Sequence, residues 1–320
     1  MDNKAFSKCY KEITKPIETD FEKLDAYFEI YFDNLQKTSS PKHIVPILKD
    51  FFSVKGKRIR SALIFLFTKA LNKETDETIL KLALAEEFIH NATLIHDDII
   101  DCSMFRREKK TLNFEHDNKL AVLAGDYLLT EAMKILSSLG DGNIYEKIRN
   151  IHTQCLSEIV DGELCQYFSR YKLLTIEQYI EKSKAKTAKL FEAGIVSAYL
   201  KNTNENEKRN IEQIKDFAQY FGIAFQIKND LDNLNTPEKI GDDIKNGDYS
   251  APLIYYAEEK NITEINNPAL VLKKLKTTSA IEKTENLLHI YINKAIENLA
   301  ILEDNLYKQA LICLCKLFTK

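Results

Sequence analysis

Apolar residues recur at helical spacing along almost the whole chain. Between residues 211 and 225 they fall every three or four positions, and a broader stripe runs from residue 82 to residue 95. This spacing places the apolar side chains on one face of an α-helix. Short polar breaks separate the stripes, at residues 38–41, 140–142, 202–204, 235–237 and 266–268. Because none of these breaks is long enough to link two domains, we predict an all-α fold that forms a single domain over residues 1–320.

The composition favours long helices and disfavours several functional classes. Of the 320 residues, 44% are hydrophobic, nine are Gly and six are Pro, and neither breaker occurs between Lys57 and Ala124. The net charge of -3 and the lack of aromatic residues among the basic runs disfavour a nucleic-acid partner. The six cysteines form no Cys-x-x-Cys pair, and no apolar run reaches the ~20 residues of a membrane span. We therefore expect a cytoplasmic protein with reduced cysteines and no integral membrane segment.

Three aspartates stand close together where one predicted helix ends. Asp97 and Asp101 are four residues apart and share a helix face, with Asp98 beside them. Most such runs are solvated acidic faces. Here apolar residues flank the carboxylates on both sides, and no basic residue lies four positions away to balance their repulsion. Carboxylate oxygens without accompanying His or Cys are typical ligands of magnesium (Mg²⁺), which is often shared with a substrate phosphate.

Two basic clusters fit a phosphate-bearing substrate. In the first, Lys57 and Arg60 lie one turn apart, next to a glycine that allows a ligand close to the backbone. In the second, Arg106 and Arg107 follow Asp101 within six residues. Arginine binds phosphate oxygens through two parallel hydrogen bonds, and lysine supplies a point charge. Either cluster alone is more often solvated surface, but together with the aspartates they predict a magnesium-dependent enzyme that acts on diphosphates.

The motifs resemble, in order and spacing, those of the trans-isoprenyl (polyprenyl) diphosphate synthases of medium- to long-chain type. The matching motifs cover most of the chain: Gly56-Lys57-Arg58-x-Arg60, His90, Asp-Asp-x-x-Asp at 97–101, Arg106-Arg107, Gly125-Asp126-Tyr127, Gly162-Glu163-x-x-Gln166, Lys186-Thr187-Ala188, Phe225-Gln226-Ile227 and Asp243-x-x-x-Gly247-x-x-x-Ala251-Pro252. The resemblance implies a helical bundle of the isoprenoid synthase type with a central cavity. It also implies a homodimer that uses Mg²⁺ to condense isopentenyl diphosphate with an allylic diphosphate, giving an all-trans polyprenyl diphosphate.

The resemblance further implies a role for each matching residue. The implied magnesium ligands are Asp97 and Asp101, with Asp98 in support. Arg106 is expected to contact the allylic diphosphate. The residues expected to hold isopentenyl diphosphate are Lys57, Arg60, His90 and Arg107. The residues expected to lie near the reacting carbons, where an allylic cation develops, are Lys186, Thr187 and Gln226. Without these neighbours, the histidine and the glutamine would be unremarkable.

The chain departs from the family pattern at its second aspartate-rich motif. Residues 229–233 read Asn-Asp-Leu-Asp-Asn, so both outer aspartates are replaced by asparagine. Asn229 can still offer a carbonyl oxygen to magnesium, and Asp230 remains beside it, so we expect these two residues to hold a metal more weakly. The family's lysine after Gly247 is replaced by Asp248, and Glu108 stands where the family usually has glycine.

Three functions remain open after these departures. The first is an active synthase, which we favour because the first aspartate motif and the expected phosphate-binding cations are all present. The second is a catalytically impaired regulatory subunit of a heteromeric prenyl diphosphate synthase. The third is a terpene cyclase or squalene-type synthase, which binds no isopentenyl diphosphate and would not need the basic motif at residues 56–60.

Small residues precede the first aspartate motif. Ala92 and Thr93 lie one turn before Asp97, and Ile89 lies a further turn away. In the family that the chain resembles, bulky aromatic residues at the first two positions accompany short products. We therefore expect an apolar tunnel along this helix face and a product of C20 or longer.

Overall fold

The computed structural model describes residues 3–38, 42–106, 109–203, 210–235, 237–265 and 268–319. The chain forms two compact units. The N-terminal unit comprises residues 14–149 and 197–203, and the C-terminal unit comprises residues 1–13, 150–196 and 204–320. The expected single domain over residues 1–320 stays a prediction.

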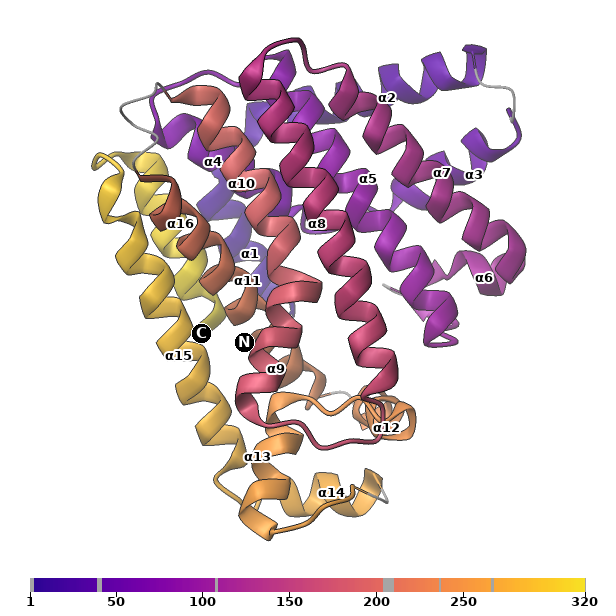
Figure 1. Ribbon diagram of the computed structural model, residues 1–320, viewed down its shortest axis with the longest axis vertical. Coiled ribbons are helices and arrows are strands. Elements are labelled where there is room, and N and C mark those ends of the chain that lie inside the picture. Colours follow the sequence, from indigo (N-terminus) through magenta and orange to yellow (C-terminus); the bar gives the residue numbers. More distant parts are fainter. Residues whose placement is uncertain are drawn as a thin grey trace. The chain divides into compact units, whose positions relative to one another are not determined.

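The described residues are almost entirely helical (Figure 1). In chain order, the elements up to residue 137 are α1 (Asn3–Thr14), η1 (Lys15–Ile17), α2 (Glu18–Thr38), α3 (Ile44–Ser53), α4 (Ile59–Ala70), α5 (Glu77–Ile100), β1 (Phe105–Arg106), β2 (Lys109–Lys110), α6 (Leu112–Glu115) and α7 (Asn118–Ser137). The next are α8 (Asn143–Phe168), α9 (Ile176–Ser183), η2 (Lys184–Ala188), α10 (Lys189–Asn202) and α11 (Ile211–Asn233). The last are α12 (Pro237–Asn246), α13 (Ala251–Lys260), α14 (Pro268–Leu275), α15 (Ala280–Asn298), η4 (Leu299–Ile301), α16 (Leu306–Lys316) and η5 (Leu317–Thr319).

The two short strands of the described residues form one antiparallel pair, β1 with β2. Within the described part of the chain, no helix is both long enough and apolar enough to cross a membrane. The predicted all-α fold class is confirmed.

Helix α5 carries the first aspartate motif and is fixed by the core of the N-terminal unit. Its first turn is capped by Asp76, whose side chain accepts a hydrogen bond from the backbone N–H of Ile79 at 2.9 Å. The helix runs side by side with α7 (Figure 1). Near its middle, the fully buried ring of Phe88 packs against those of Phe28 and Phe52, with centroids 5.8 and 5.6 Å apart. The carboxylates at its end therefore project from a rigid helix.

The C-terminal unit is centred on α11, which packs against α15 and against η2. The five residues of η2 form a single π-helical turn. This turn approaches α11 at Gly222, where an added Cβ would lie 2.4 Å from the Cα of Ala188. Because no side chain larger than hydrogen fits there, Gly222 lets η2 and α11 come into backbone contact. A π-helical turn inside a run of α-helix often marks a functional site.

Candidate active site

At the acidic end of α5, the carboxylate of Asp98 is paired with an arginine. Asp98 is 2% exposed, and Arg106 from β1 donates through Nε to both its oxygens, at 2.9 and 3.1 Å. The Nη2 atom of Arg106 lies 2.8 Å from Oδ1 of the same carboxylate. Burial raises the pKa of Asp98, and the hydrogen bonds and charge of Arg106 oppose that rise. The pair holds the arginine against the end of α5.

The remaining carboxylates of the motif lie nearer to solvent. Asp97 is partly exposed and Asp101 is exposed at the C-terminal cap of α5. Their hard oxygen atoms suit a magnesium ion. Among the described residues, however, no group of three or more His, Cys, Asp or Glu side chains converges closely enough to hold a metal. The assignment of Asp97, Asp98 and Asp101 as metal ligands stays a prediction.

The first basic segment is anchored to α2 by an aspartate that sequence reasoning missed. Asp25 accepts from Lys55 at 2.5 Å and pairs with Arg58, whose guanidinium also lies 4.9 Å from the ring centre of Phe28. Burial raises the pKa of Asp25, but the hydrogen bonds from both cations outweigh it, and the pKa lies below its usual value. Arg58 is thus held by the fold, in a left-handed conformation with φ of 49°. This pairing fixes the basic segment against α2.

The other predicted diphosphate-binding residues fall in different settings. Lys57 is exposed, and Arg60 is partly buried at the start of α4. His90 is partly buried on α5, two turns before Asp97. Arg107 lies outside the described residues. The assignments of Lys57, Arg60, His90 and Arg107 stay predictions.

The predicted chain-length residues lie on α5 before the aspartates. Ile89 and Ala92 are fully buried. Thr93 is partly buried, and its hydroxyl donates to the backbone oxygen of His90 at 2.8 Å. The rings that surround Phe88 adjoin this stretch of the helix. The tunnel itself stays a prediction.

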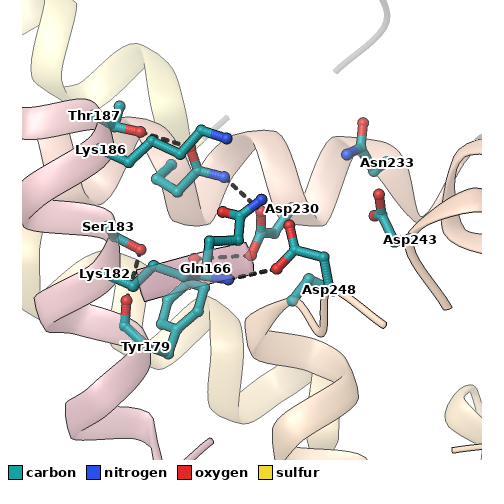
Figure 2. Close-up of a pocket in the computed structure, with 12 residues that line it drawn as sticks. Gln166, Tyr179, Lys182, Ser183, Lys186, Thr187, Asp230, Asn233, Asp243 and Asp248 are labelled. Atoms are coloured by element: carbon teal, nitrogen blue, oxygen red, sulfur yellow. Dashed lines mark hydrogen bonds and ion pairs between the residues drawn. The ribbon is translucent and has the colours of Figure 1, made fainter. Parts of the chain in front are cut away.

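A polar pocket of about 110 Å³ lies within the C-terminal unit (Figure 2). It is lined by Gln166, Tyr179, Lys182, Ser183, Lys186, Thr187, Gln226, Asp230, Asn233, Asp243, Asp248 and Ser250. The three predicted catalytic residues of this unit, Lys186, Thr187 and Gln226, are thus brought together. The extra residue per turn in η2 helps to explain how consecutive residues of this segment line one pocket.

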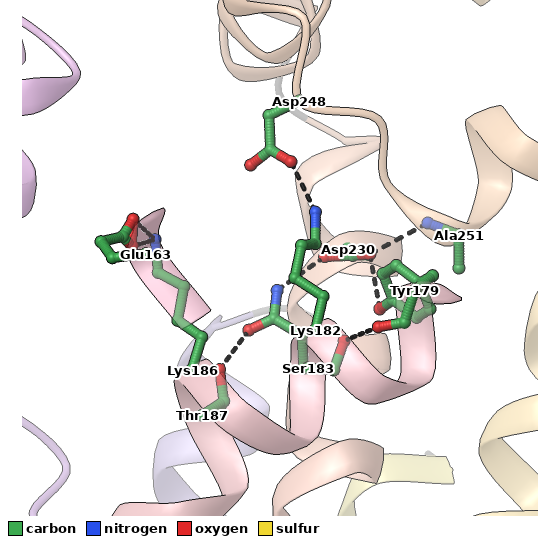
Figure 3. A network of polar contacts seen from close by, with 10 residues as sticks. Glu163, Tyr179, Lys182, Ser183, Lys186, Thr187, Asp230, Asp248 and Ala251 are labelled. Carbon is green, nitrogen blue, oxygen red and sulfur yellow. Dashed lines mark hydrogen bonds and ion pairs between the residues drawn. The ribbon is translucent and has the colours of Figure 1, made fainter. Parts of the chain in front are cut away.

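Hydrogen bonds join the predicted residues into a chain (Figure 3). The hydroxyl of Thr187 donates to Oε1 of Gln226 at 3.0 Å, and Nε2 of Gln226 donates to Asp230 at 2.9 Å. Lys186 binds both oxygens of Glu163 on α8, at 2.7 and 2.6 Å. These contacts fix the amide of Gln226 with its oxygen toward Thr187.

Asp230 is enclosed by protein donors. It is 5% exposed and accepts from the Tyr179 hydroxyl at 2.8 Å and from the backbone N–H of Ala251 at 3.1 Å, in addition to Gln226. Burial raises the pKa of Asp230, while these donors and the charge of Lys182 oppose the rise. The pKa of Tyr179 is raised as well, first by burial and then by the neighbouring carboxylate. Asp230 thus links α9, α11 and the start of α13. Its assignment as a metal ligand stays a prediction.

The asparagines of the second motif differ in position. Asn233 lines the pocket, whereas Asn229, one turn earlier on α11, is partly exposed and is not among the lining residues. The predicted metal ligand is Asn229, but Asn233 is the asparagine of this motif that lines the pocket. The assignment of Asn229 stays a prediction.

An ion pair that sequence reasoning missed closes one side of the pocket. Nζ of Lys182, in the last turn of α9, lies 2.6 Å from Oδ1 of Asp248. Asp248 follows Gly247, whose φ of 69° suits glycine. A Cβ there would also lie 2.4 Å from the backbone nitrogen of Tyr171. The only sequence signal for Lys182 is its place one turn before Lys186.

Comparison with known proteins identifies the family. The family described as Polyprenyl synthetase matches residues 41–290. The chain belongs to the polyprenyl synthetase family. It is 33% identical over 294 residues to a decaprenyl-diphosphate synthase of Dictyostelium discoideum, covering 86% of this chain and 63% of that relative. It is 31% identical over 329 residues to a prenyl transferase of Cyanophora paradoxa, covering 96% of both.

A solved structure has the same fold as this chain. A polyprenyl synthase from Caulobacter crescentus CB15, complexed with calcium and isoprenyl diphosphate, superposes with a TM-score of 0.83. It is 24% identical and covers 97% of this chain and 98% of its own. The predicted family, the enzyme class of prenyltransferase and the isoprenoid synthase-type helical fold are confirmed.

Proposed function

We propose that this polyprenyl synthetase uses Mg²⁺ to condense isopentenyl diphosphate with an allylic diphosphate, giving an all-trans polyprenyl diphosphate of C20 or longer. The observation that carries the proposal is the end of α5. There, Arg106 is bound to Asp98, and Asp97 and Asp101 of the same helix end supply further hard oxygen donors. Such an arrangement suits a diphosphate with its metal. The relative from Dictyostelium, named as a decaprenyl-diphosphate synthase, supports a long product.

In the N-terminal unit, the proposed task is to hold diphosphate groups. Asp97 and Asp101 would hold magnesium, which when bound neutralises the charge of the leaving diphosphate. Asp98 would serve by positioning Arg106, which contacts the allylic diphosphate. The residues proposed to hold isopentenyl diphosphate are Lys57, Arg60, His90 and Arg107. Cations fixed in place before the reaction stabilise charge without reorganising during it.

In the C-terminal unit, the proposed task is to stabilise the reacting carbons. The allylic carbon–oxygen bond breaks, and its electron pair leaves with the diphosphate. The double bond of isopentenyl diphosphate then forms the new carbon–carbon bond, and a proton is lost. Thr187 and Gln226 present oxygen dipoles that suit a developing cation, and Lys186 is oriented by Glu163.

The second aspartate-rich motif is proposed to contribute less than the first. Asn229 would offer a neutral oxygen to the metal. Asp230 would act mainly by holding Gln226 and Tyr179, because its oxygens already accept three protein hydrogen bonds. The metal then depends chiefly on Asp97 and Asp101.

Ile89, Ala92 and Thr93 are proposed to set the product length along α5. A cytoplasmic homodimer with one domain over residues 1–320 completes the proposal, and its support is the resemblance to the family.

The test is to incubate the purified protein alone with magnesium, isopentenyl diphosphate and a series of allylic primers, and to separate the products by chromatography. We expect products extended by isopentenyl units to C20 or longer. If the protein alone makes no product and gains activity only with a second synthase subunit, the regulatory-subunit alternative is correct instead.

A further inference from the structure

Lys182 and Asp248 form the ion pair that faces the pocket of the C-terminal unit (Figures 2 and 3). The lysine comes from α9, and the aspartate comes from the loop after α12. Their side chains are 14% and 34% exposed, so the pair is shielded but can be reached from the pocket. The ring of Tyr179 lies 5.9 Å from Nζ of the lysine and supports it from the side.

The two lysines that line the pocket are held differently. Lys186 binds both oxygens of Glu163, so its ammonium is committed to a carboxylate on α8. Lys182 binds a single oxygen of Asp248 among the described residues. An ammonium has three donors, so Lys182 can also donate to an anion in the pocket.

Asp248 also stands where the resemblance leads us to expect a lysine. Another cation lies at this place in the fold: the ammonium of Lys182 lies 2.6 Å from the Asp248 carboxylate. A positive charge is thus delivered to the same spot from α9 rather than from the loop after α12.

We propose that Lys182 is a diphosphate-binding residue of this pocket and that Asp248 holds its ammonium only until a diphosphate competes for it. A diphosphate oxygen competes with Asp248 for the ammonium, because it carries a higher charge density than a carboxylate and binds lysine as a point charge. The inference rests on the proposed function, and it adds a binding residue that the motif pattern does not contain.

A purely structural role for the pair makes a different prediction. If the pair only ties the loop after α12 to α9, removing either partner breaks the same contact and has the same effect. If Lys182 binds diphosphate, the two changes differ. Loss of Lys182 removes the cation, whereas loss of the Asp248 charge removes a competitor for it.

The test is isothermal titration of inorganic diphosphate, with magnesium, into the full-length wild type and three variants. The variants are Lys182→Met, Asp248→Asn and the control Lys308→Met. Lys308 has a similarly buried side chain, 12% exposed, and pairs with Asp304 at 2.7 Å on another part of the unit. We expect Lys182→Met to bind diphosphate about tenfold more weakly or worse, the range expected for a lost charged hydrogen bond. Asp248→Asn and Lys308→Met should bind at least as tightly as wild type.

The proposal is overturned if Lys182→Met binds diphosphate as tightly as wild type, or if Asp248→Asn weakens binding as much as Lys182→Met does. Should the methionine variant unfold, Lys182→Gln replaces it in the same comparison. Because calorimetry needs no turnover, the outcome is independent of the proposed reaction. A wild type that binds diphosphate through Lys182 but makes no product would overturn the proposed function alone.

Discussion

The residues that matter most to this account are charged groups held by specific partners. The aspartate motif at 97–101 could be predicted from residue type and spacing, because a helix places those positions on one face. The partner of each charged residue could not be predicted. Asp98 with Arg106 and Lys182 with Asp248 join residues from different elements, and a single sequence does not tell which elements meet. The same holds for Tyr179, which contacts Asp230 from another helix.

Replacing Arg106 by methionine should destabilise the protein, because it leaves the buried carboxylate of Asp98 without its cation. We expect a loss of about 2 kcal/mol in the free energy of unfolding. Chemical denaturation measures it. Adding Asp98→Asn to Arg106→Met should recover part of this loss, since the uncompensated charge is gone. A double variant as unstable as the sum of the two single variants would contradict the pairing.

Replacing Asp25 by asparagine should lower stability at neutral pH and have little effect in acid. The pKa of Asp25 is lowered in the folded protein, so its stabilising contribution is present above the unfolded value of 3.8. That contribution is lost as the pH falls through the folded pKa. Solvent screens this partly exposed pair, so the difference at pH 7 should be about 1 kcal/mol or less. Urea denaturation across the pH range tests this, and a constant difference down to low pH would contradict it.

At the scale of elements, the helices were predictable and their irregularities were not. The apolar stripes at residues 82–95 and 211–225 correspond to α5 and α11. The π-helical turn η2 was not predicted from the apolar spacing, because that spacing was matched only to the period of an α-helix. Its contact with Gly222 is tertiary and depends on how η2 meets α11. The sequence therefore predicts that Lys186 and Thr187 are candidate catalytic residues, but it does not predict how they are arranged.

Replacing Gly222 by alanine should push η2 away from α11 and reduce turnover. The new Cβ would lie 2.4 Å from the Cα of Ala188, and backbone must shift to accommodate it. We expect a loss of about 1–3 kcal/mol in stability together with a lower kcat. Gly241→Ala is the matched control, because a Cβ there meets nothing within 4 Å. Equal effects of the two substitutions on kcat would argue against close packing at η2.

Replacing Ala92 by phenylalanine should shorten the product. Ala92 is fully buried on the α5 face that leads to the Phe88 rings, so a large side chain there would fill the proposed tunnel. Ala92→Val should give an intermediate shift. Product lengths by chromatography measure the effect. A distribution that stays the same in a folded Ala92→Phe variant would place the growing chain elsewhere.

At the scale of the whole molecule, the ordered motifs indicated a polyprenyl synthetase, and the match over residues 41–290 confirms it. This was possible because the family's residues recur in fixed order along a chain whose helices set their spacing. The chain departs from the family pattern at the second aspartate motif, where asparagine replaces both outer aspartates. Of the two aspartates that remain in this motif, Asp230 is buried among protein donors, and Lys182 from α9 pairs with Asp248. Both findings agree with the proposal that the metal depends chiefly on the first motif.

The most direct measurement is product formation by the purified protein and by Asp97→Ala, each with magnesium, isopentenyl diphosphate and an allylic primer. The account predicts chain extension by the wild type alone and none by the variant, because Asp97 would be one of the two principal metal ligands. Matching circular dichroism spectra would establish that the variant is folded. A folded Asp97→Ala protein that extends the primer as fast as the wild type would contradict the account.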